Sequence, residues 1–239
     1  MIALLRKRQA FFLFLFPFLY LPFCNAQVGQ WVWMKGSSAV NNFGTFGTLL
    51  TPAPANNPPG TYEGFEWTDT TGKFWYMGGG SSQLAFHSAL WMYDPPTNNW
   101  TWMMGAIGNQ QAPVYGILGT PAPGNTPGAR GGGVPTWTGK DGQLWMFGGY
   151  LPPGFQNDLW KYDPYPSSPT YNQWTFVKGK TTTGAGNAVY GTKGVPAMGN
   201  TPGERAENSA TWTDTTGNLW LLGGNLFGGG NLRNDLWRY

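Results

Sequence analysis

The chain has 239 residues, of which only 10% are charged, and it is rich in glycine (37), proline (20) and tryptophan (14). An average globular protein has about 25% charged residues, so this composition favours a large β-protein with many tight turns. Three of the 14 basic residues are Arg6, Lys7 and Arg8, which leaves 11 to balance the 11 acidic ones. The body of the chain is therefore neutral, and no basic surface argues for a nucleic-acid partner.

Residues 1–26 have the pattern of a secretory signal peptide: a basic start, an apolar run and small residues up to Ala26. The apolar run contains Pro17 and Pro22 and is shorter than the ~20 residues of a membrane-spanning helix. We therefore expect cleavage near Ala26 and a secreted, periplasmic or cell-surface protein, in preference to an uncleaved anchor or a lipoprotein joined through Cys24. Cleavage removes the only cysteine, so we expect no disulfide and no thiolate metal ligand.

One unit is repeated along the rest of the chain. The phrases EWTDTTGKFWYMGGG (66–80), TWTGKDGQLWMFGGY (136–150) and TWTDTTGNLWLLGGN (211–225) are similar, and each is followed by a phrase of the form Leu-Trp-x-Tyr. A third phrase has the members QWVWMKG (30–36), NWTWMMG (99–105) and QWTFVKG (173–179). We therefore divide residues 27–239 into three units of about 30–98, 99–172 and 173–239.

Each unit predicts four short antiparallel strands. The first ends at a Trp-Thr pair, and a tight hairpin with an aspartate such as Asp69 or Asp214 leads to the second. The second is a continuous apolar run, as expected of a strand covered on both faces. The third ends at a proline, and the fourth alternates, as in Trp100-Thr101-Trp102.

Four antiparallel strands with a double glycine after the second are typical of a propeller blade. The Gly-Gly pair, the following Tyr-Asp and the later tryptophan resemble kelch repeats. The intervals of 70 and 75 residues between Trp67, Trp137 and Trp212 resemble the long kelch-type repeats of exported bacterial, galactose-oxidase-like proteins. The predicted fold class is all-β, with three four-stranded kelch-type blades that form part of a β-propeller. The structural markers of the repeat are Gly78, Gly79, Gly148, Gly149, Gly223, Gly224, Trp75, Trp145 and Trp220.

The resemblance to galactose oxidase implies a copper site with two histidines, two tyrosines and a cysteine that is cross-linked to one of the tyrosines. The chain has one histidine, His87, and no cysteine after the leader. We therefore predict no catalytic residue, no metal and no cofactor. His87 lies in a variable loop, where a lone histidine is more typical of a solvated side chain. The tryptophans all occupy repeat-equivalent positions, which favours packing between blades over a ligand platform.

Most of the acidic residues recur by repeat, which favours structural roles. Glu63, Glu66, Glu204 and Glu207 do not recur and lie near the start of a first strand in units one and three. A glycosidase needs two carboxylates about 5–9.5 Å apart. Nothing in the sequence places these two units at that range, so a carboxylate pair is not expected.

The chain enters a first strand through PGAR, ending at Arg130, and through PGER, which contains Arg205. These arginines either contact backbone carbonyls or a neighbouring aspartate, or bind a glycan carboxylate or another anion. We expect this entry segment to share a face with the loops between second and third strands, which vary most between units. Variable loops on a rigid scaffold are where binding usually resides. The candidate ligand-binding residues of this face are Arg130, Arg205, Tyr62, His87 and Arg233.

The favoured function is an exported module that binds glycan or protein through this loop face. The alternatives are a galactose-oxidase-like or sialidase-like carbohydrate enzyme with its active residues on further blades, and a structural cell-surface protein. Closed propellers have about four to eight blades. Three blades therefore predict either the front part of a longer propeller or self-association, in which two chains form one ring.

Overall fold

The computed structural model describes residues 29–81, 86–106, 108, 110–182, 184, 186–207, 209–225, 230 and 232–239. The expected leader, residues 1–26, lies outside this part of the chain. The chain divides into two compact units, one ending at Trp33 and the other running Met34–Tyr239. All strands lie in the second unit. The described residues include no helix that could cross a membrane.

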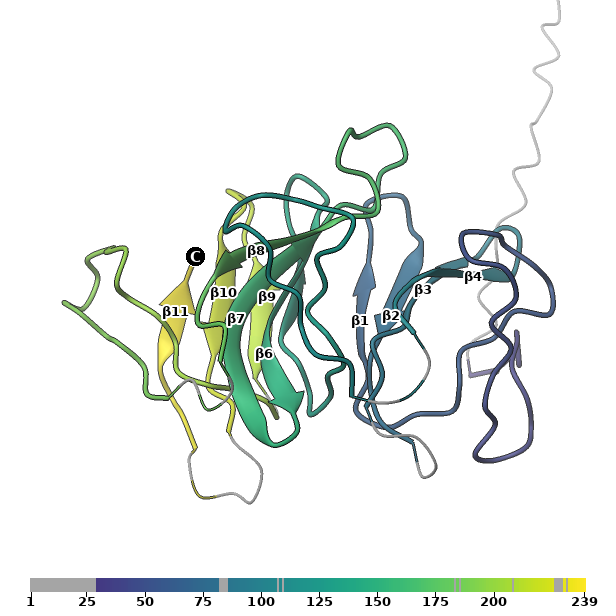
Figure 1. The fold of residues 1–239 in the computed structure, drawn as a ribbon, viewed down its shortest axis with the longest axis horizontal. Coiled ribbons are helices and arrows are strands. Elements are labelled where there is room, and N and C mark those ends of the chain that lie inside the picture. Colours follow the sequence, from purple (N-terminus) through teal and green to yellow (C-terminus); the bar gives the residue numbers. More distant parts are fainter. Residues whose placement is uncertain are drawn as a thin grey trace, which may run out of the picture. The chain divides into compact units, whose positions relative to one another are not determined.

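Three antiparallel sheets, which we call blades 1, 2 and 3, make up the second unit (Figure 1). Within each blade, strands that follow one another in sequence pair side by side. Blade 1 consists of β1 (Phe65–Thr68), β2 (Phe74–Met77), β3 (Leu90–Asp94) and β4 (Asn99–Met104). Blade 2 consists of β5 (Thr136–Thr138), β6 (Leu144–Leu151), β7 (Gly154–Tyr162) and β8 (Trp174–Lys178). Blade 3 consists of β9 (Ala210–Thr213), β10 (Leu219–Leu222) and β11 (Leu236–Arg238). The protein thus has the all-β, blade-by-blade organisation predicted from its repeats.

Two features differ from the expected unit. Blade 3 has three strands among the described residues, and residues 29–36, where a fourth-strand phrase occurs, contain no strand. A strand needs a neighbouring edge to satisfy its backbone groups, and the phrase alone does not supply one. The sheets also divide the chain differently from the predicted units, because β4 pairs with β3 and closes blade 1.

The hairpins between first and second strands form as predicted. Asp69 Oδ1 accepts the Thr71 N–H at 2.8 Å, and Gly72 adopts a φ of 83°, a conformation that glycine reaches without strain. The other Asp69 oxygen accepts the indole N–H of Trp75 at 2.8 Å, and Asp214 accepts that of Trp220 in the same way. Burial works to raise the pKa of Asp69, but hydrogen bonds from Thr71, Trp75 and the backbone outweigh it, so the pKa is lowered.

The inner strand β5 lies next to β1 on one side and β9 on the other, and these strands join the blades. The Thr138 hydroxyl donates to the Thr68 carbonyl at 2.7 Å, and the Thr213 hydroxyl donates to the Thr138 carbonyl at 2.9 Å. Both bonds join equivalent positions of successive blades. The junction between blades 1 and 2 is therefore repeated between blades 2 and 3.

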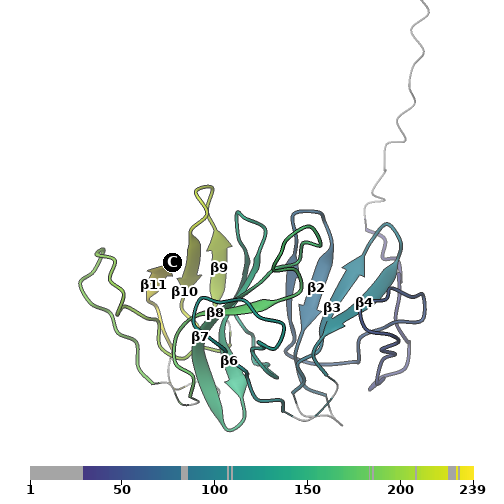
Figure 2. The same ribbon diagram turned by 45° about the horizontal axis from the view of Figure 1, so that its top comes forward.

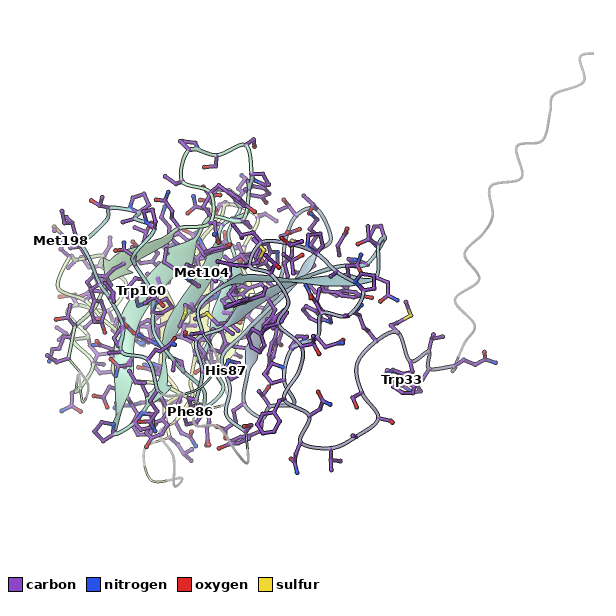
Figure 3. The ribbon with its side chains drawn as sticks, turned by 45° about the vertical axis from the view of Figure 1, so that its right-hand side comes forward. Trp33, Phe86, His87, Met104, Trp160 and Met198 are labelled. Carbon is purple, nitrogen blue, oxygen red and sulfur yellow. The ribbon has the colours of Figure 1, made fainter. Side chains whose placement is uncertain are left out.

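Tryptophans fill the spaces between blades. The Trp67 indole donates to the Trp145 carbonyl at 2.7 Å, and the Trp75 ring packs against Tyr162 with centroids 5.4 Å apart. Trp160, labelled in Figure 3, and Trp174 are completely buried. Fully burying a large apolar side chain stabilises a fold by roughly 1.5–3 kcal/mol. The interblade packing therefore supports the scaffold assignment of these repeat-equivalent tryptophans.

Replacing Trp75 with phenylalanine keeps an aromatic ring but removes the hydrogen bond to Asp69 in a buried position. We expect the Trp75→Phe variant to lose about 1–3 kcal/mol of unfolding free energy, measured by urea denaturation. Trp220→Phe removes the equivalent bond to Asp214 at a more exposed place and should cost less. Equal losses of unfolding free energy in both variants would contradict the idea that burial determines how much this hydrogen bond contributes to stability.

Candidate ligand-binding site on the loop face

The entry to each first strand lies beside the segment that follows the second strand, as expected. Tyr62 pairs with Gly80, and Gly131 pairs with Tyr150. In blade 3 the Ala206 N–H donates to the Asn225 carbonyl at 3.0 Å. We call this end of the three blades the loop face. It gathers the variable loops on one side of the scaffold.

The double glycines form the junctions of the loop face. The Gly79 N–H of blade 1 donates to the Arg130 carbonyl at 2.7 Å, and the Gly149 N–H of blade 2 donates to the Arg205 carbonyl at 2.7 Å. A Cβ placed on Gly78 would lie 2.4 Å from the Arg130 carbonyl oxygen. A side chain at this position would push adjacent blades apart, which gives the marker glycines a physical role.

Arg130 lies completely inside the protein and pairs with Asp158, which is also completely buried. One of its terminal nitrogens donates to Asp158 Oδ2 at 2.6 Å, and further bonds reach the carbonyls of Pro127 (2.8 Å) and Gly148 (2.9 Å). Burial works to lower the pKa of Arg130, but the charge and hydrogen bonds of Asp158 outweigh it and raise the pKa. The guanidinium of Arg130 thus donates hydrogen bonds to one carboxylate and to two backbone carbonyls.

Arg205 repeats this arrangement in blade 3. Its terminal nitrogens donate to the two oxygens of Asp235 at 2.6 Å, and one of them also donates to the Gly223 carbonyl at 2.6 Å. Burial works to raise the pKa of Asp235, but hydrogen bonds from Arg205, Trp237 and Tyr190 and the charge of Arg205 lower it to about 2. These geometries match the alternative in which the arginines contact carbonyls and an aspartate. A ligand contact through Arg130 or Arg205 stays a prediction, and it would require a ligand to reach a fully buried group.

His87 is 1% exposed, which corrects the expectation of a solvated side chain. It lies next to the buried Phe86 (Figure 3). Neither of its ring nitrogens has a hydrogen-bond partner within the described part of the chain. The equivalent residue of blade 2, Gln156, is also buried without a side-chain partner among these residues, and Arg233 of blade 3 is half-buried. Burial lowers the pKa of His87 to about 4.

A row of aromatic rings crosses the loop face from blade 1 to blade 2. Ring centroids lie 6.2 Å apart for Tyr62 and Phe86, 5.7 Å for Phe86 and Tyr150, and 5.1 Å for Tyr150 and Phe155. Tyr62 is 55% exposed at the end of this row. The row therefore presents an aromatic surface to solvent, supported from beneath by a buried ring.

Two glutamates occupy equivalent entry positions in blades 1 and 3. Glu63 follows Tyr62, Glu207 follows Ala206, and Gly132 holds the same position in blade 2. Burial and then the negative charge of Glu207 raise the pKa of Glu63, against a hydrogen bond from the Gly132 backbone. The charge of Glu207 therefore acts on Glu63, although the sequence did not place these two units near each other.

The backbone of this site is unusual at Glu63. Its φ is 56°, a left-handed conformation that costs a side-chain-bearing residue about 1–2 kcal/mol. Gly132 has a φ of 81° at the equivalent position, so the local turn is shared. Strain of this kind often accompanies functional positions. No group of three or more metal-binding side chains occurs among the described residues.

Comparisons with known proteins give a likeness of structure. No family model matches the chain, and no curated protein matches it. A solved structure entitled "Structure of YjhT" is similar with a TM-score of 0.43 and 14% sequence identity. The match covers 77% of this chain and 53% of that one, so the chain spans about half the length of that structure. A likeness at this level carries no conclusion about activity.

Replacing Arg130 with methionine should leave the Asp158 carboxylate buried and unpaired. We expect the Arg130→Met variant to lose about 3–5 kcal/mol of unfolding free energy in urea denaturation, because one partner of a buried ion pair is removed. Lys180→Met, at an exposed position, serves as the control and should change stability by less than about 0.5 kcal/mol. A loss below about 1 kcal/mol in Arg130→Met would show that the pair is not important for stability.

Burial of His87 should make folding sensitive to acid. Since its folded pKa of about 4 lies below the ordinary value of 6.5, the unfolded chain binds the proton more readily between these values. Stability contributed by the neutral ring is complete above pH ~6.5 and falls as the pH drops towards 4, by on the order of 3 kcal/mol.

The control is His87→Gln, which copies the residue found at the equivalent position of blade 2 and cannot titrate. Urea denaturation at pH 7.5 and at several lower values down to 4.5 should show a smaller loss of stability in His87→Gln than in the unmodified protein. Identical pH dependence in the two proteins would contradict the buried, neutral state of His87.

Proposed function

We propose that this chain is part of an exported, kelch-like propeller that binds neutral glycans through its loop face. The observation that carries the proposal is the exposed Tyr62 ring at the end of an aromatic row on the loop face, with Glu63 as the next residue in the chain. Export rests on the expected leader, and the kelch assignment rests on the resemblance of the repeats.

Aromatic rings can pack against the C–H groups of a sugar, and carboxylates can accept hydrogen bonds from its hydroxyl groups. The exposed Tyr62 ring offers an apolar face on which the C–H groups of a pyranose can stack. Carboxylates accept hydrogen bonds from sugar hydroxyls, and hydrogen bonds to charged groups contribute about 1.5–3 kcal/mol each. The pKa of Glu63 is raised by burial and then by the negative charge of Glu207, so the charge of a second acid acts on this carboxylate.

The charge of this site favours a neutral glycan over an anionic one. The buried Arg130 is paired with Asp158, and Arg205 is paired with Asp235. The carboxylates of Glu63 and Glu207 would repel the carboxylate of an acidic sugar. This proposal therefore replaces the anion contact considered from the sequence with a contact to hydroxyl groups.

A carbohydrate enzyme is the second candidate, and the raised pKa of Glu63 beside Glu207 is the observation that favours it. A carboxyl group with a raised pKa is typical of the general acid in glycoside hydrolysis. Incubation of bound oligosaccharides with the protein, followed by measurement of released reducing ends, separates the two candidates. Turnover that is lost in Glu207→Gln would favour the enzyme.

Binding should be measured with an array of neutral oligosaccharides and their uronic-acid and sialylated counterparts. We expect neutral members to bind preferentially, and the Tyr62→Ala and Glu63→Gln variants to weaken this binding about tenfold or more, because a stacking surface and a charged acceptor are removed.

Tyr165→Ala is the matched control, since Tyr165 contacts Thr70 of a strand hairpin at the opposite end of the blades. This variant should bind as the unmodified protein does. Absence of binding to every saccharide on the array, or preferential binding of acidic ones, would contradict the proposal.

A further inference from the structure

A groove of about 1360 Å³ lies along β11, the last strand of blade 3. Its walls are β10 and β11 on one side and the loop 190–202 on the other, with apolar residues such as Leu221 and Trp237 among them. Figures 1 and 2 show β11 at the edge of its sheet. Met198, labelled in Figure 3, is 96% exposed beside this groove.

In blade 2 the equivalent space holds a strand. The loop before β5 lies over β8, and the Gly119 N–H donates to the Phe176 carbonyl at 2.8 Å. Asn125 donates from its side-chain amide to the Thr120 carbonyl and to the Trp174 carbonyl, both at 3.0 Å. Blade 1 has the same bonds, from Leu50 and Asn56 to carbonyls of β4, and so β4 and β8 are each held between a third strand and a loop.

Blade 3 has the loop without the strand. Asn200 stands where Asn125 stands in blade 2 and donates to the Val195 carbonyl at 3.1 Å. The described residues offer it no second carbonyl, and they offer none to the N–H of Gly194, the equivalent of Gly119. The loop is therefore already shaped to receive a strand that blade 3 does not contain.

The exposure of β11 leads to the same conclusion. Leu236 is 56% exposed, whereas the equivalent Leu159 is 6% exposed. Tyr239 is 55% exposed, whereas the equivalent Tyr162 is completely buried. An uncovered strand edge with large apolar side chains is a site for pairing with another strand.

An aromatic cluster shows what kind of side chain is missing. In blade 2 the Tyr115 ring lies 5.3 Å from Trp160 of the third strand and 4.8 Å from Phe176 of the fourth. In blade 3 the Tyr190 ring lies 5.3 Å from Trp237 of the third strand. The missing strand should therefore carry an aromatic residue at the position of Phe176.

Residues 30–35 carry the fourth-strand phrase, Gln-Trp-Val-Trp-Met-Lys, with Trp33 at the position of Phe176. The blade 2 pairing of Trp160 with Phe176 then predicts Trp33 opposite Trp237. The next pair in that ladder predicts Val32 opposite Arg238.

The contacts of Lys35 place the end of this segment beside blade 1. In blade 2, Lys178 at the end of the fourth strand donates to the Met198 carbonyl, in the loop of the following blade. Lys35 donates at the same distance of 2.7 Å to the Pro54 carbonyl, which is the equivalent of Met198 in the loop of blade 1. Lys35 thus lies where the fourth strand of a blade preceding blade 1 would end.

We propose that two copies of this chain pair and that residues 30–35 of each copy form the fourth strand of blade 3 in the other. The exchanged strand supplies carbonyls to Gly194 and Asn200 and covers Leu236 and Trp237. Because both copies do the same, the contact is symmetric. This proposal is independent of the glycan site.

The test uses disulfide formation between chains. The full chain carrying Cys24→Ser is prepared with Val32→Cys and, under a different mass tag, with Arg238→Cys; the two are then mixed and oxidised. Directly opposed residues of antiparallel strands have Cα atoms about 4.5–5.5 Å apart, within the range for a disulfide. We expect a cross-linked product containing one chain of each tag, and an unmodified protein with twice the chain mass in light scattering.

Leu236→Cys is the control for register, because its expected partner is Lys35 and it should cross-link with Val32→Cys much less than Arg238→Cys does. A monomer in light scattering, or a dimer that gives no 32–238 cross-link, would overturn the proposal. A chain carrying both Val32→Cys and Arg238→Cys that closes a disulfide within itself, regardless of dilution, would also overturn it in favour of closure within one chain.

Discussion

The arrangement of the blades depends on one buried arginine at each junction. The side chain of Arg130 holds Asp158 in the third strand of blade 2, while its carbonyl accepts the Gly79 N–H from the preceding blade. A single residue thus connects the entry of one first strand, the third strand beside it and the second strand of the neighbouring blade. Arg205 does the same at the next junction, with Asp235 and Gly149. A buried ion pair contributes little net stability compared with an apolar pair. Its bidentate geometry, however, fixes the orientation of the arginine relative to the aspartate, and therefore the orientation of the segments that carry them. Successive blades require this fixed orientation.

The sequence predicted most of the scaffold because every strand phrase recurs. Some residues determine turns through interactions with residues that are close in the sequence, so their roles follow from local chemistry. They are the hairpin aspartates, the glycines with positive φ and the double glycines. The strand expected at 30–36 does not follow in the same way, because strand formation needs a partner edge that the phrase does not contain. The burial of His87 was also not predictable, since its cover comes from tertiary packing around a loop that differs in every unit.

The candidate site was only partly predictable. Tyr62 was named as a candidate, whereas the effect of the Glu207 charge on Glu63 depends on how the entry segments of units one and three are placed in space. An alignment of the entry segments would have given a signal, because the two acids and Gly132 occupy one repeat position. The arginines were named too, but their aspartate partners lie about 30 residues further along the chain, and spacing alone left the alternatives open.

The identity of the two blade junctions has a consequence for how such a protein can grow. The threonine and glycine bonds join each blade to the next in the same way at both junctions. In repeat proteins most of the packing of a unit is against its immediate neighbours. A gene duplication that inserts one further unit would therefore add a blade with ready-made contacts on both sides and would require no new kind of interaction. The number of blades can change by whole units while the chemistry of their loops changes separately.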